Sequence, residues 1–327
     1  MKITIPKKFV CAYALQLIVP VLLVCEVFLH QLEIKQIETA LQNLNAIASI
    51  QKARLQEMVY ANYQRILGLT SQTILKQNLT AFLQGGDASA LVAMKNILKD
   101  TQQPFVDVQE IFILDQSGKL FVSTNDANEG LSPIDQRTFK NGHDRLTLTP
   151  YEAKAIKLVL MGPIFDGESQ LGVAGMIIDN RTLVRIVEDY SGLGQTGETV
   201  VVRKNEQGEA EFLLSSRDRT HPENMANVPQ YQLGRAVTQA LFRYEGLLRH
   251  TMDYRGQPVF AATRFLLEEE WGIVVKIDQT EVLRPIAQLR WFAYILLTAV
   301  VLFWLVVMPL WIQWLAKIKS ARASLDL

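Results

Sequence analysis

The stretch Gly172-Val-Ala-Gly-Met-Ile-Ile-Asp179 and its counterpart Gly272-Ile-Val-Val-Lys-Ile-Asp278 decide the fold, because one pattern occurs twice in this chain. Each stretch is a run of apolar and β-branched residues after a turn, and each ends in Ile-Asp before a helix start. An aspartate at this place can accept a hydrogen bond from the first helical turn, and we expect Asp179 and Asp278 to do so. The repeat predicts two tandem modules of one architecture.

Two hairpins are predicted in each repeat. The first hairpin turns at Asp115–Gly118 in one copy and at Asn205–Gly208 in the other. The second hairpin, which ends in the stretch quoted above, turns at Asp166–Gly167 and at Glu268–Glu269. Short strands joined by such turns favour antiparallel sheets, so the predicted fold class is α+β.

A long helix is predicted before the first repeat. Its apolar residues step by three and four along the chain, and Gln51 interrupts the series. This spacing is typical of a dimer seam and equally of an amphipathic helix packed on its own domain. The series consists of Ile34, Ile37, Leu41, Leu44, Ala48, Leu55 and Met58.

Two hydrophobic spans, at residues 9–29 and 290–313, flank everything between them. Each has about the 20 apolar residues that a helix needs to cross a bilayer. A cleaved signal peptide is the alternative for the first span, but that span is long and has no small-x-small cleavage site before Gln31. Basic residues at both outer ends predict cytoplasmic termini and a middle region outside the cytoplasm. They are Lys2, Lys7, Lys8, Lys317, Lys319 and Arg322. We therefore expect a two-pass protein of the bacterial inner membrane with a periplasmic or extracellular sensor region.

The predicted order of parts follows from these features. It is a cytoplasmic tail (1–8), a transmembrane helix (9–29), a long stalk helix (30–84), a membrane-distal sheet module (85–190), a membrane-proximal sheet module (191–285), a second transmembrane helix (290–313) and a cytoplasmic tail (314–327).

Composition and motifs exclude several function classes. The 327 residues carry a net charge of zero, so no nucleic acid partner is expected. The only cysteines, Cys11 and Cys25, lie in the first span, and four scattered histidines lack ligand spacing, so neither a metal nor another cofactor is expected. The chain has no Gly-x-Ser-x-Gly and no His-Glu-x-x-His, so no catalytic residue is assigned. Gly192, Gly194 and Gly197 have the spacing of a dinucleotide-binding loop, but a helix precedes them and a strand follows, which is the wrong order.

Three features together resemble a known family of sensors. They are the stretch Leu171–Asp179, the linker Gly192–Glu198 before a strand, and the helix-sheet-sheet order between two spans. On these the chain resembles the double Cache sensor region, in which two PAS-like modules are carried by a long N-terminal helix. The resemblance covers residues 31–289. It implies an input region like those of bacterial histidine kinases, chemoreceptors and diguanylate cyclases, with a small ligand in the membrane-distal module.

The resemblance places the ligand pocket between the first sheet and the polar segment Asn125–Tyr151, interpreted as a loop that joins the two hairpins. Arg137 and Phe139 are the leading candidates, because a guanidinium can bind a carboxylate bidentately while an aromatic ring walls the pocket. The other candidates are Asp126, His143 and Tyr151. A solvated loop with no ligand is the alternative.

The ligand class follows from a departure within that resemblance. Amino-acid sensors of the family carry an arginine followed by Trp-Tyr and a strand carboxylate for the ammonium group, whereas this chain has Arg137-Thr-Phe139 and Ile177 at those places. An isoleucine cannot compensate a buried ammonium, so an organic acid is predicted in preference to an amino acid.

The predicted function is that of a membrane-bound sensor, not itself an enzyme, that forms a homodimer. The output domain is expected in a longer polypeptide of which this chain is the input half, or in a separate partner. A membrane-anchored structural or adaptor protein without a ligand is the main alternative, and a membrane-anchored hydrolase is a further one.

Overall fold

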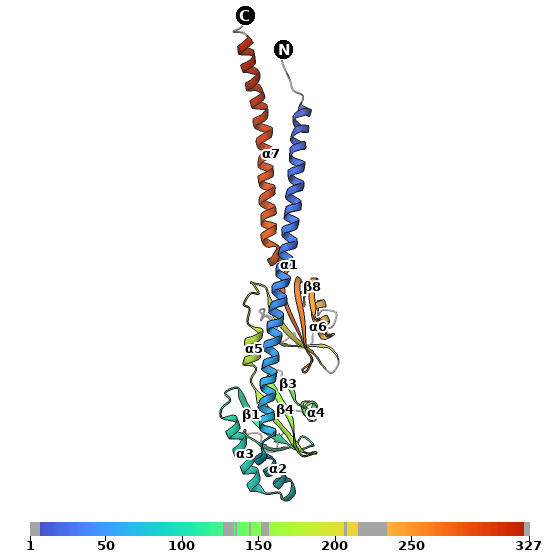
Figure 1. Cartoon of the computed structure of the whole chain (residues 1–327), viewed down its shortest axis with the longest axis vertical. Coiled ribbons are helices and arrows are strands. Elements are labelled where there is room, and N and C mark those ends of the chain that lie inside the picture. Colours follow the sequence, from blue (N-terminus) through green and yellow to red (C-terminus); the bar gives the residue numbers. More distant parts are fainter. Residues whose placement is uncertain are drawn as a thin grey trace. The chain divides into compact units, whose positions relative to one another are not determined.

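A computed structural model describes residues 7–126, 134, 136–143, 145–151, 157–205, 208–214 and 234–323 (Figure 1). The chain divides into two units, described here separately: Met1–Gln42 with Gln279–Leu327, and Asn43–Asp278. The second unit holds both sheets. We call residues 73–190 the first module and residues 191–278 the second module.

Three helices precede the first sheet: α1 (Lys7–Thr70), α2 (Thr73–Gly85) and α3 (Ala88–Gln102). Within the Asn43–Asp278 unit, the stripe of α1 predicted from the three-four spacing is buried inside the chain itself at Leu44, Ala48, Leu55 and Met58. Gln51 belongs to the same buried stripe and does not interrupt the helix. Packing on its own domain therefore accounts for this part of the pattern, and a homodimer stays a prediction.

The first sheet has the order β2-β1-β5-β4-β3, with all neighbours antiparallel. Two short helices, α4 (Gln136–Gly142) and α5 (Arg181–Val187), belong to the same module. The strands are β1 (Val108–Leu114), β2 (Leu120–Ser123), β3 (Thr147–Tyr151), β4 (Lys157–Asp166) and β5 (Ser169–Ile178).

The second sheet repeats this topology as β7-β6-β10-β9-β8, and α6 (Gly234–Leu241) covers one of its faces. Its strands are β6 (Glu198–Lys204), β7 (Ala210–Leu214), β8 (Gly246–Met252), β9 (Pro258–Leu266) and β10 (Trp271–Asp278). The duplication predicted from the sequence is confirmed, and the fold class is α+β.

All four predicted hairpins are present as β1–β2, β4–β5, β6–β7 and β9–β10. Gly118 and Gly208 take the positive φ angles that their turns require. The interpretation of Asn125–Tyr151 as a single loop was wrong, because α4 and β3 lie within it. Both elements are short and the segment is polar, so its composition concealed a helix and an edge strand.

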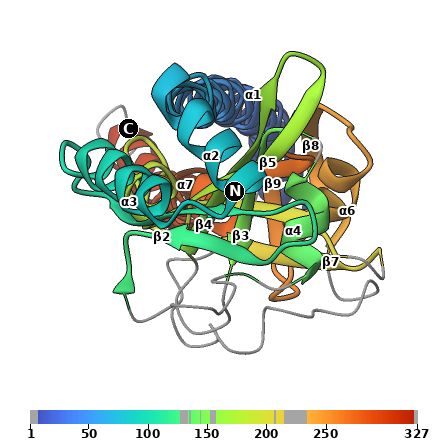
Figure 2. The ribbon, with the colours of Figure 1, turned by 90° about the horizontal axis from the view of Figure 1, so that it is seen from below.

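The two faces of the first sheet meet different helices. On one face a Cβ added at Gly162 would meet Ile66 of α1, and one added at Gly172 would come close to Leu79 of α2. On the other face a Cβ added at Gly142 of α4 would lie 2.6 Å from the Cβ of Met161. We call this second face, which α4 covers, the inner face. Figure 2 shows α2 and α3 in the first module, where the two helices pack against each other.

The linker between the modules has the glycine spacing of a dinucleotide-binding loop, but the helix and the strand beside it stand in the opposite order to that loop. Helix α5 ends before it and strand β6 begins directly after Gly197, as expected. Gly192 and Gly194 both have positive φ, and a Cβ on Gly197 would lie 2.0 Å from the carbonyl oxygen of Leu193. The glycines therefore allow the chain to turn tightly between α5 and β6.

Of the two aspartates expected to cap helices, Asp179 is confirmed in this role, while the cap by Asp278 stays a prediction. Asp179 Oδ1 accepts a hydrogen bond from the backbone N–H of Arg181 at 3.1 Å, in the first turn of α5, as predicted. Asp278 Oδ1 accepts a hydrogen bond from the Arg255 guanidinium at 2.6 Å, so this carboxylate belongs to an ion pair inside the second module.

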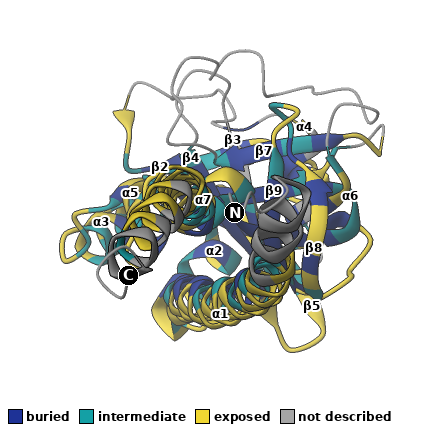
Figure 3. Cartoon of the chain, turned by 90° about the horizontal axis from the view of Figure 1, so that it is seen from above, coloured by how far each residue is buried: buried dark blue, intermediate teal, exposed yellow. Residues whose placement is uncertain are grey.

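In the other unit, α7 (Gln279–Ala323) is long and apolar. Among the residues whose side chains the structure describes, its segment Gln279–Val307, in which an 18-residue window reaches a mean hydropathy of 2.1, is the one stretch long and apolar enough to cross a membrane. Its described apolar residues are largely exposed, and Figure 3 colours exposed residues of α7 yellow. Arg290 pairs with Glu33 of α1 at 3.1 Å within this unit. Much of the predicted first span lies outside the residues whose side chains are described, so two-pass topology stays a prediction.

Candidate ligand-binding site

The inner face of the first sheet is set by strand register. Phe112 of β1 lies opposite Gly175 of β5, and Gly175 lies opposite Met161 of β4. Cross-strand partners project to the same side of a sheet, so each such row shares one face. The buried apolar cluster on this face consists of Phe112, Leu114, Leu120, Ile134, Phe139, Val159, Met161, Val173 and Ile177.

Helix α4 lies directly on this cluster through Phe139. This predicted site residue is 8% exposed, and its ring lies so close to Gly118 that a Cβ added there would be 3.1 Å from it. The ring also makes an edge-to-face contact with His143, with the ring centroids 5.2 Å apart. Phe139 is therefore part of the cover over the inner face.

Glu110 is a charged group on the same face that was missing from the predicted site. It lies opposite Ile177 in the strand register and is only 5% exposed. Ser123 Oγ donates a hydrogen bond to Glu110 Oε1 at 2.5 Å, and Asn125 Nδ2 donates to Oε2 at 3.4 Å. A buried carboxylate is costly unless hydrogen bonds or a cation compensate it, and these two hydrogen bonds supply part of that compensation.

The remaining predicted residues are distributed around α4 and β3. His143 accepts a hydrogen bond from Gln170 Nε2 through its backbone oxygen at 2.9 Å. Arg137 lies in α4, and the backbone of Tyr151 pairs with Lys157 at the edge of the sheet. The side chains of Arg137 and Tyr151 lie outside the described part of the chain, so their proposed contacts with a ligand stay predictions.

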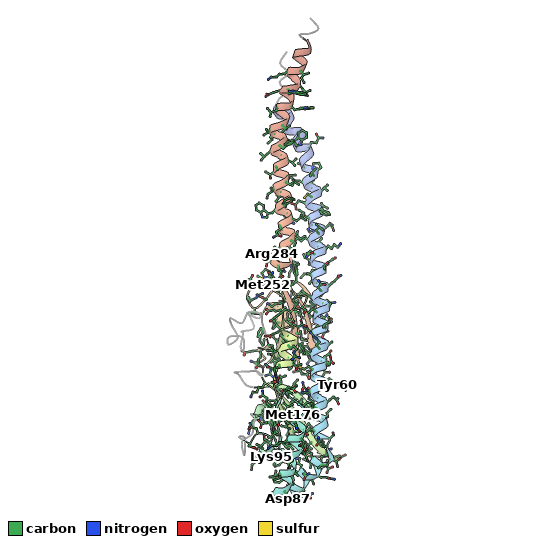
Figure 4. All side chains as sticks on the ribbon, turned by 90° about the vertical axis from the view of Figure 1, so that its left-hand side faces the viewer. Tyr60, Asp87, Lys95, Met176, Met252 and Arg284 are labelled. Carbon is green, nitrogen blue, oxygen red and sulfur yellow. The ribbon has the colours of Figure 1, made fainter. Side chains whose placement is uncertain are left out.

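Asp126 lies instead at the β2 edge of the sheet. It forms an ion pair with Lys95 of α3 at 2.5 Å, and this hydrogen-bonded ammonium holds the pKa of Asp126 below its usual range. Lys95, labelled in Figure 4, also lines a hollow of about 330 Å³ between α3 and β2 that includes Ser123 and Asn125. The hollow therefore adjoins the polar group around Glu110.

The second module carries a denser charged cluster at the corresponding place. Glu198 and Lys276 lie opposite each other on β6 and β10, each 2% exposed, and Lys276 Nζ is 2.6 Å from Glu198 Oε1. Lys276 also pairs with Asp253, while the Tyr254 hydroxyl donates to Glu198 at 2.8 Å. The Tyr254 ring lies 4.4 Å from the ammonium, within the range of a cation–π contact. The ammonium is thus surrounded by anionic and aromatic groups.

The protonation of this cluster follows from its contacts. Burial would raise the pKa of Asp253, but the Lys276 ammonium, the Gln257 N–H and the Arg255 guanidinium outweigh it and hold that pKa below its usual range. Arg255 in turn bridges Asp253 and Asp278, at 2.7 and 2.6 Å. The cluster therefore connects the face of the second sheet that α6 covers to the end of β10.

Sequence reasoning missed Glu110, which is a polar residue near the start of the first strand. Counting back by two from Leu114 places Phe112 and Glu110 on one face, which is the signal that could have found it. The position of Glu110 also weakens the argument that Ile177 leaves the first module without a carboxylate for an ammonium group. A carboxylate does lie in that row of the inner face, but on the adjacent strand.

Comparison with known proteins gives structural neighbours and no sequence relatives. No family model matches the chain, and no curated protein matches it. The sensory domain of the Campylobacter jejuni chemoreceptor Tlp3 is similar at 11% identity with a TM-score of 0.54, covering 76% of this chain and 98% of that one. The ligand-binding domain of the same receptor in complex with L-valine is similar at 12% identity and a TM-score of 0.53, covering 76% and 97%.

A third neighbour is the ligand-binding domain of the Pseudomonas aeruginosa amino acid chemoreceptor PctC in complex with GABA, at 19% identity and a TM-score of 0.49, covering 72% of this chain and 98% of that chain. These neighbours are sensory ligand-binding domains and not catalytic domains. With its long N-terminal helix and two sheets of equal topology, the chain has the fold of the double Cache sensory domain.

Proposed function

We propose that this chain is the input region of a two-pass membrane sensor that binds a small molecule on the inner face of the first module. The observation that carries the proposal is Glu110, a buried carboxylate on a sheet face that α4 covers. Folding does not require an acidic group among apolar neighbours, and ligand sites are usually apolar with a few convergent polar groups. The fold likeness to chemoreceptor sensory domains supports the same function.

The ligand preference drawn from the sequence needs revision. An organic acid was favoured because Ile177 supplies no carboxylate, but Glu110 supplies one from the neighbouring strand, and a second carboxylate beside it would be repelled. The Tlp3 domain has been solved with L-valine bound, so ligands of that receptor include an amino acid. Neither observation favours an organic acid over an amino acid.

Helix α1 offers a route by which ligand binding could be passed along the sensor unit. Arg65 pairs with Asp107 beside the first sheet at 2.6 Å, and Arg54 pairs with Asp189 before the linker at 2.5 Å. Lys52 pairs with Glu245 of the second module at 2.7 Å. One helix thus holds both modules, so we propose that a ligand-induced shift of the first module is transmitted along α1, provided that the ligand binds two states with different affinity.

Ligand binding is tested on the full chain in lipid nanodiscs, with hydrogen exchange as the readout. A ligand present at 100 times its Kd should raise the melting temperature by about 5–10 °C. It should also slow amide exchange in β1 and β5, while β6 and β10 serve as the internal reference. Arg137→Ala, from the predicted site, should weaken binding without lowering the melting temperature of the free protein. If no amine, amino acid or organic acid changes either readout, the adaptor alternative without a ligand is favoured.

Membrane topology is tested by cysteine labelling. Cys11 and Cys25 are the only cysteines, so a cysteine-free background is obtained with two substitutions. Gln84→Cys, at an exposed position of α2, should react with a membrane-impermeant maleimide in intact spheroplasts, whereas Lys317→Cys in α7 should react only after lysis. Equal labelling of both positions would contradict the two-pass orientation.

Function as an enzyme is the contrasting hypothesis. Hydrolysis of an ester panel by the full chain, lost on Glu110→Gln, would favour a membrane-anchored hydrolase. The sensory domains among its structural neighbours support an input module instead, whose output domain lies in a longer polypeptide or in a partner protein.

A further inference from the structure

A hollow of about 90 Å³ lies on the other face of the first sheet, where α1 meets the start of α5. We call it the α1–α5 hollow. Leu158 of β4 and Ile178 of β5, which are cross-strand partners, line it. The adjacent residues Val159 and Ile177 belong to the inner-face cluster. Side chains alternate between the faces of a strand, so the sheet itself separates this hollow from the inner face.

The buried part of the lining is mostly apolar. One water molecule needs at least about 10–15 Å³ of such a volume, so the hollow accommodates a molecule of about five non-hydrogen atoms. A short alkyl group gains free energy by burial against an apolar surface. The apolar residues of the lining that are more than nine-tenths buried are Met58, Leu158, Ile178 and Leu183.

The rim of the hollow is polar, and its main hydrogen-bond donor is Arg65 of α1. Arg65 Nη1 donates to Asp107 Oδ2 at 2.6 Å and to Asn62 Oδ1 at 3.2 Å. Both hydrogen bonds leave from one nitrogen, and a guanidinium carries three further N–H donors. Thr182, at an exposed position of α5, adds a hydroxyl that can both donate and accept.

The charges around the rim cancel. Asp107 and Asp179 both line the hollow, and each is paired with an arginine. Asp107 pairs with Arg65, while Asp179 Oδ2 lies 2.6 Å from Nε of Arg181. Neither a free anion nor a free cation therefore gains net attraction here, and each would lose part of its hydration. An uncharged polar group that accepts from Arg65 and donates to Asp107 avoids that loss.

We propose that the α1–α5 hollow binds a small uncharged molecule with a hydrogen-bonding head and a short alkyl body, of which a primary amide is the simplest example. The head is held by Arg65, Asp107 and Thr182, and the alkyl body lies against Leu158 and Ile178. Such a molecule contacts α1 and α5 at once, so its binding stabilises α1 in its place on the first module. This inference goes beyond the proposed function, because it uses the opposite face of the sheet.

The first test compares three head groups on one alkyl chain. Propionamide, propionate and propylammonium are titrated separately into the full chain in nanodiscs and followed by ligand-observed NMR. Propionamide should bind with a Kd of about 1 mM, about tenfold more tightly than either ion. It should also slow amide exchange in residues 58–65 of α1 and 181–187 of α5, while β6 and β10 serve as the internal reference.

The second test fills the hollow from its edge. Ala61→Leu enlarges an exposed residue of α1 that lines the hollow, and it should abolish propionamide binding without lowering the melting temperature of the free protein. Ala53→Leu makes the same change at an exposed position of α1 outside the hollow and is the matched control.

Removal of one polar group from the rim gives a graded effect. Thr182→Val deletes the hydroxyl at nearly constant volume and should weaken propionamide binding about tenfold. Thr101→Val, in α3 and outside the hollow, should leave the Kd unchanged.

The outcomes separate this site from the inner face. Absence of propionamide binding at about 10 mM, tighter binding of either ion, or binding that survives Ala61→Leu overturns the proposal. Arg137→Ala, from the predicted inner-face site, should leave propionamide binding unchanged, and a loss as large as that of Ala61→Leu would place the molecule on the inner face instead. Failure of the proposed function alone would leave propionamide binding and its sensitivity to Ala61→Leu intact.

Discussion

The two sheets share one topology but differ in the residues that occupy the same row of cross-strand partners. In the second module Glu198 is paired with Lys276, and that lysine also contacts Asp253. In the first module the equivalent row holds Glu110 and Ile177 within an apolar cluster that α4 covers. The duplicated fold thus places a buried carboxylate in the same row of each module, within a dense charge cluster in the second module and beside an apolar cluster in the first.

A second difference lies one row further along the same face. The first module pairs a large residue with the smallest, since the Phe112 ring lies over Gly175, whereas the equivalent row of the second module pairs Val200 with Val274. The summed side-chain volume is kept while its distribution changes. The modules therefore keep their packing and vary their chemistry, as expected if one has a structural role while the other accepts a ligand.

The largest expected effect comes from breaking the charge cluster of the second module. Lys276→Met removes the ammonium and leaves Glu198 and Asp253 buried without it, which should lower the free energy of unfolding by about 3–5 kcal/mol. Chemical denaturation followed by the fluorescence of Trp271, buried in β10, measures this change. Arg243→Met, which breaks an exposed pair with Glu270, is the matched control and should change stability far less. A loss for Lys276→Met as small as that of the control would contradict the structural role of this cluster.

Gly175→Ala tests the packing difference between the modules. An added Cβ would lie 2.1 Å from the Phe112 ring, so we expect a loss of about 1–3 kcal/mol by overpacking. Introducing the second module's pair, Phe112→Val with Gly175→Val, should recover much of the stability that Phe112→Val alone loses, because the volume is restored. Equilibrium denaturation of the three variants measures the coupling. Strict additivity would show that the two residues do not share one space.

The hairpins could be predicted from the sequence because their signals are local. Asp115–Gly118 and Asn205–Gly208 provide the turn chemistry, and the flanking residues alternate or are β-branched. The apolar stripe along α1 could also be predicted from its spacing. Periodicity does not show which surface covers such a stripe, so packing within the chain and a dimer seam could not be distinguished.

The site was harder to predict for physical reasons. Strand β3 contains Pro150 and lies at a sheet edge, so its composition is typical of a loop. Phe139 was found as an aromatic residue near the sheet, whereas Glu110 was missed because a polar residue at a strand end gives no sign of burial. Its significance appears only when strand register places it opposite Ile177 and beside Ser123. Such a contact between distant segments has no local signature.

The charge cluster should also make stability depend on pH. The folded-state pKa of Asp253 is lowered below the ordinary 3.8, so its contribution is present above the unfolded-state value and is lost as the pH falls through the folded-state value. We expect the free energy of unfolding to decrease on acidification below about pH 4, with a slope from this one group of at most about 1.4 kcal/mol per pH unit. Urea titrations monitored by circular dichroism at several pH values measure the slope. Asp253→Asn should make it shallower, and an unchanged slope would assign the acid sensitivity to other carboxylates.

The smallest effects are expected where α1 holds the two modules through ion pairs. Arg54 and Asp189 are partly exposed, and although hydrogen bonds from Ser191 and Arg54 lower the pKa of Asp189 to about 2, solvent screening limits what this pair contributes. Arg54→Ala should therefore cost less than about 1 kcal/mol, and the loss should shrink further in 1 M salt. Arg65 is less exposed, pairs with Asp107 and lies 4.7 Å from the Phe105 ring centroid, so Arg65→Ala should cost more and depend less on salt. Denaturation of both variants at low and high salt compares them directly. Equal losses with equal salt dependence would contradict the expected difference between the two pairs, both of which join α1 to the first module.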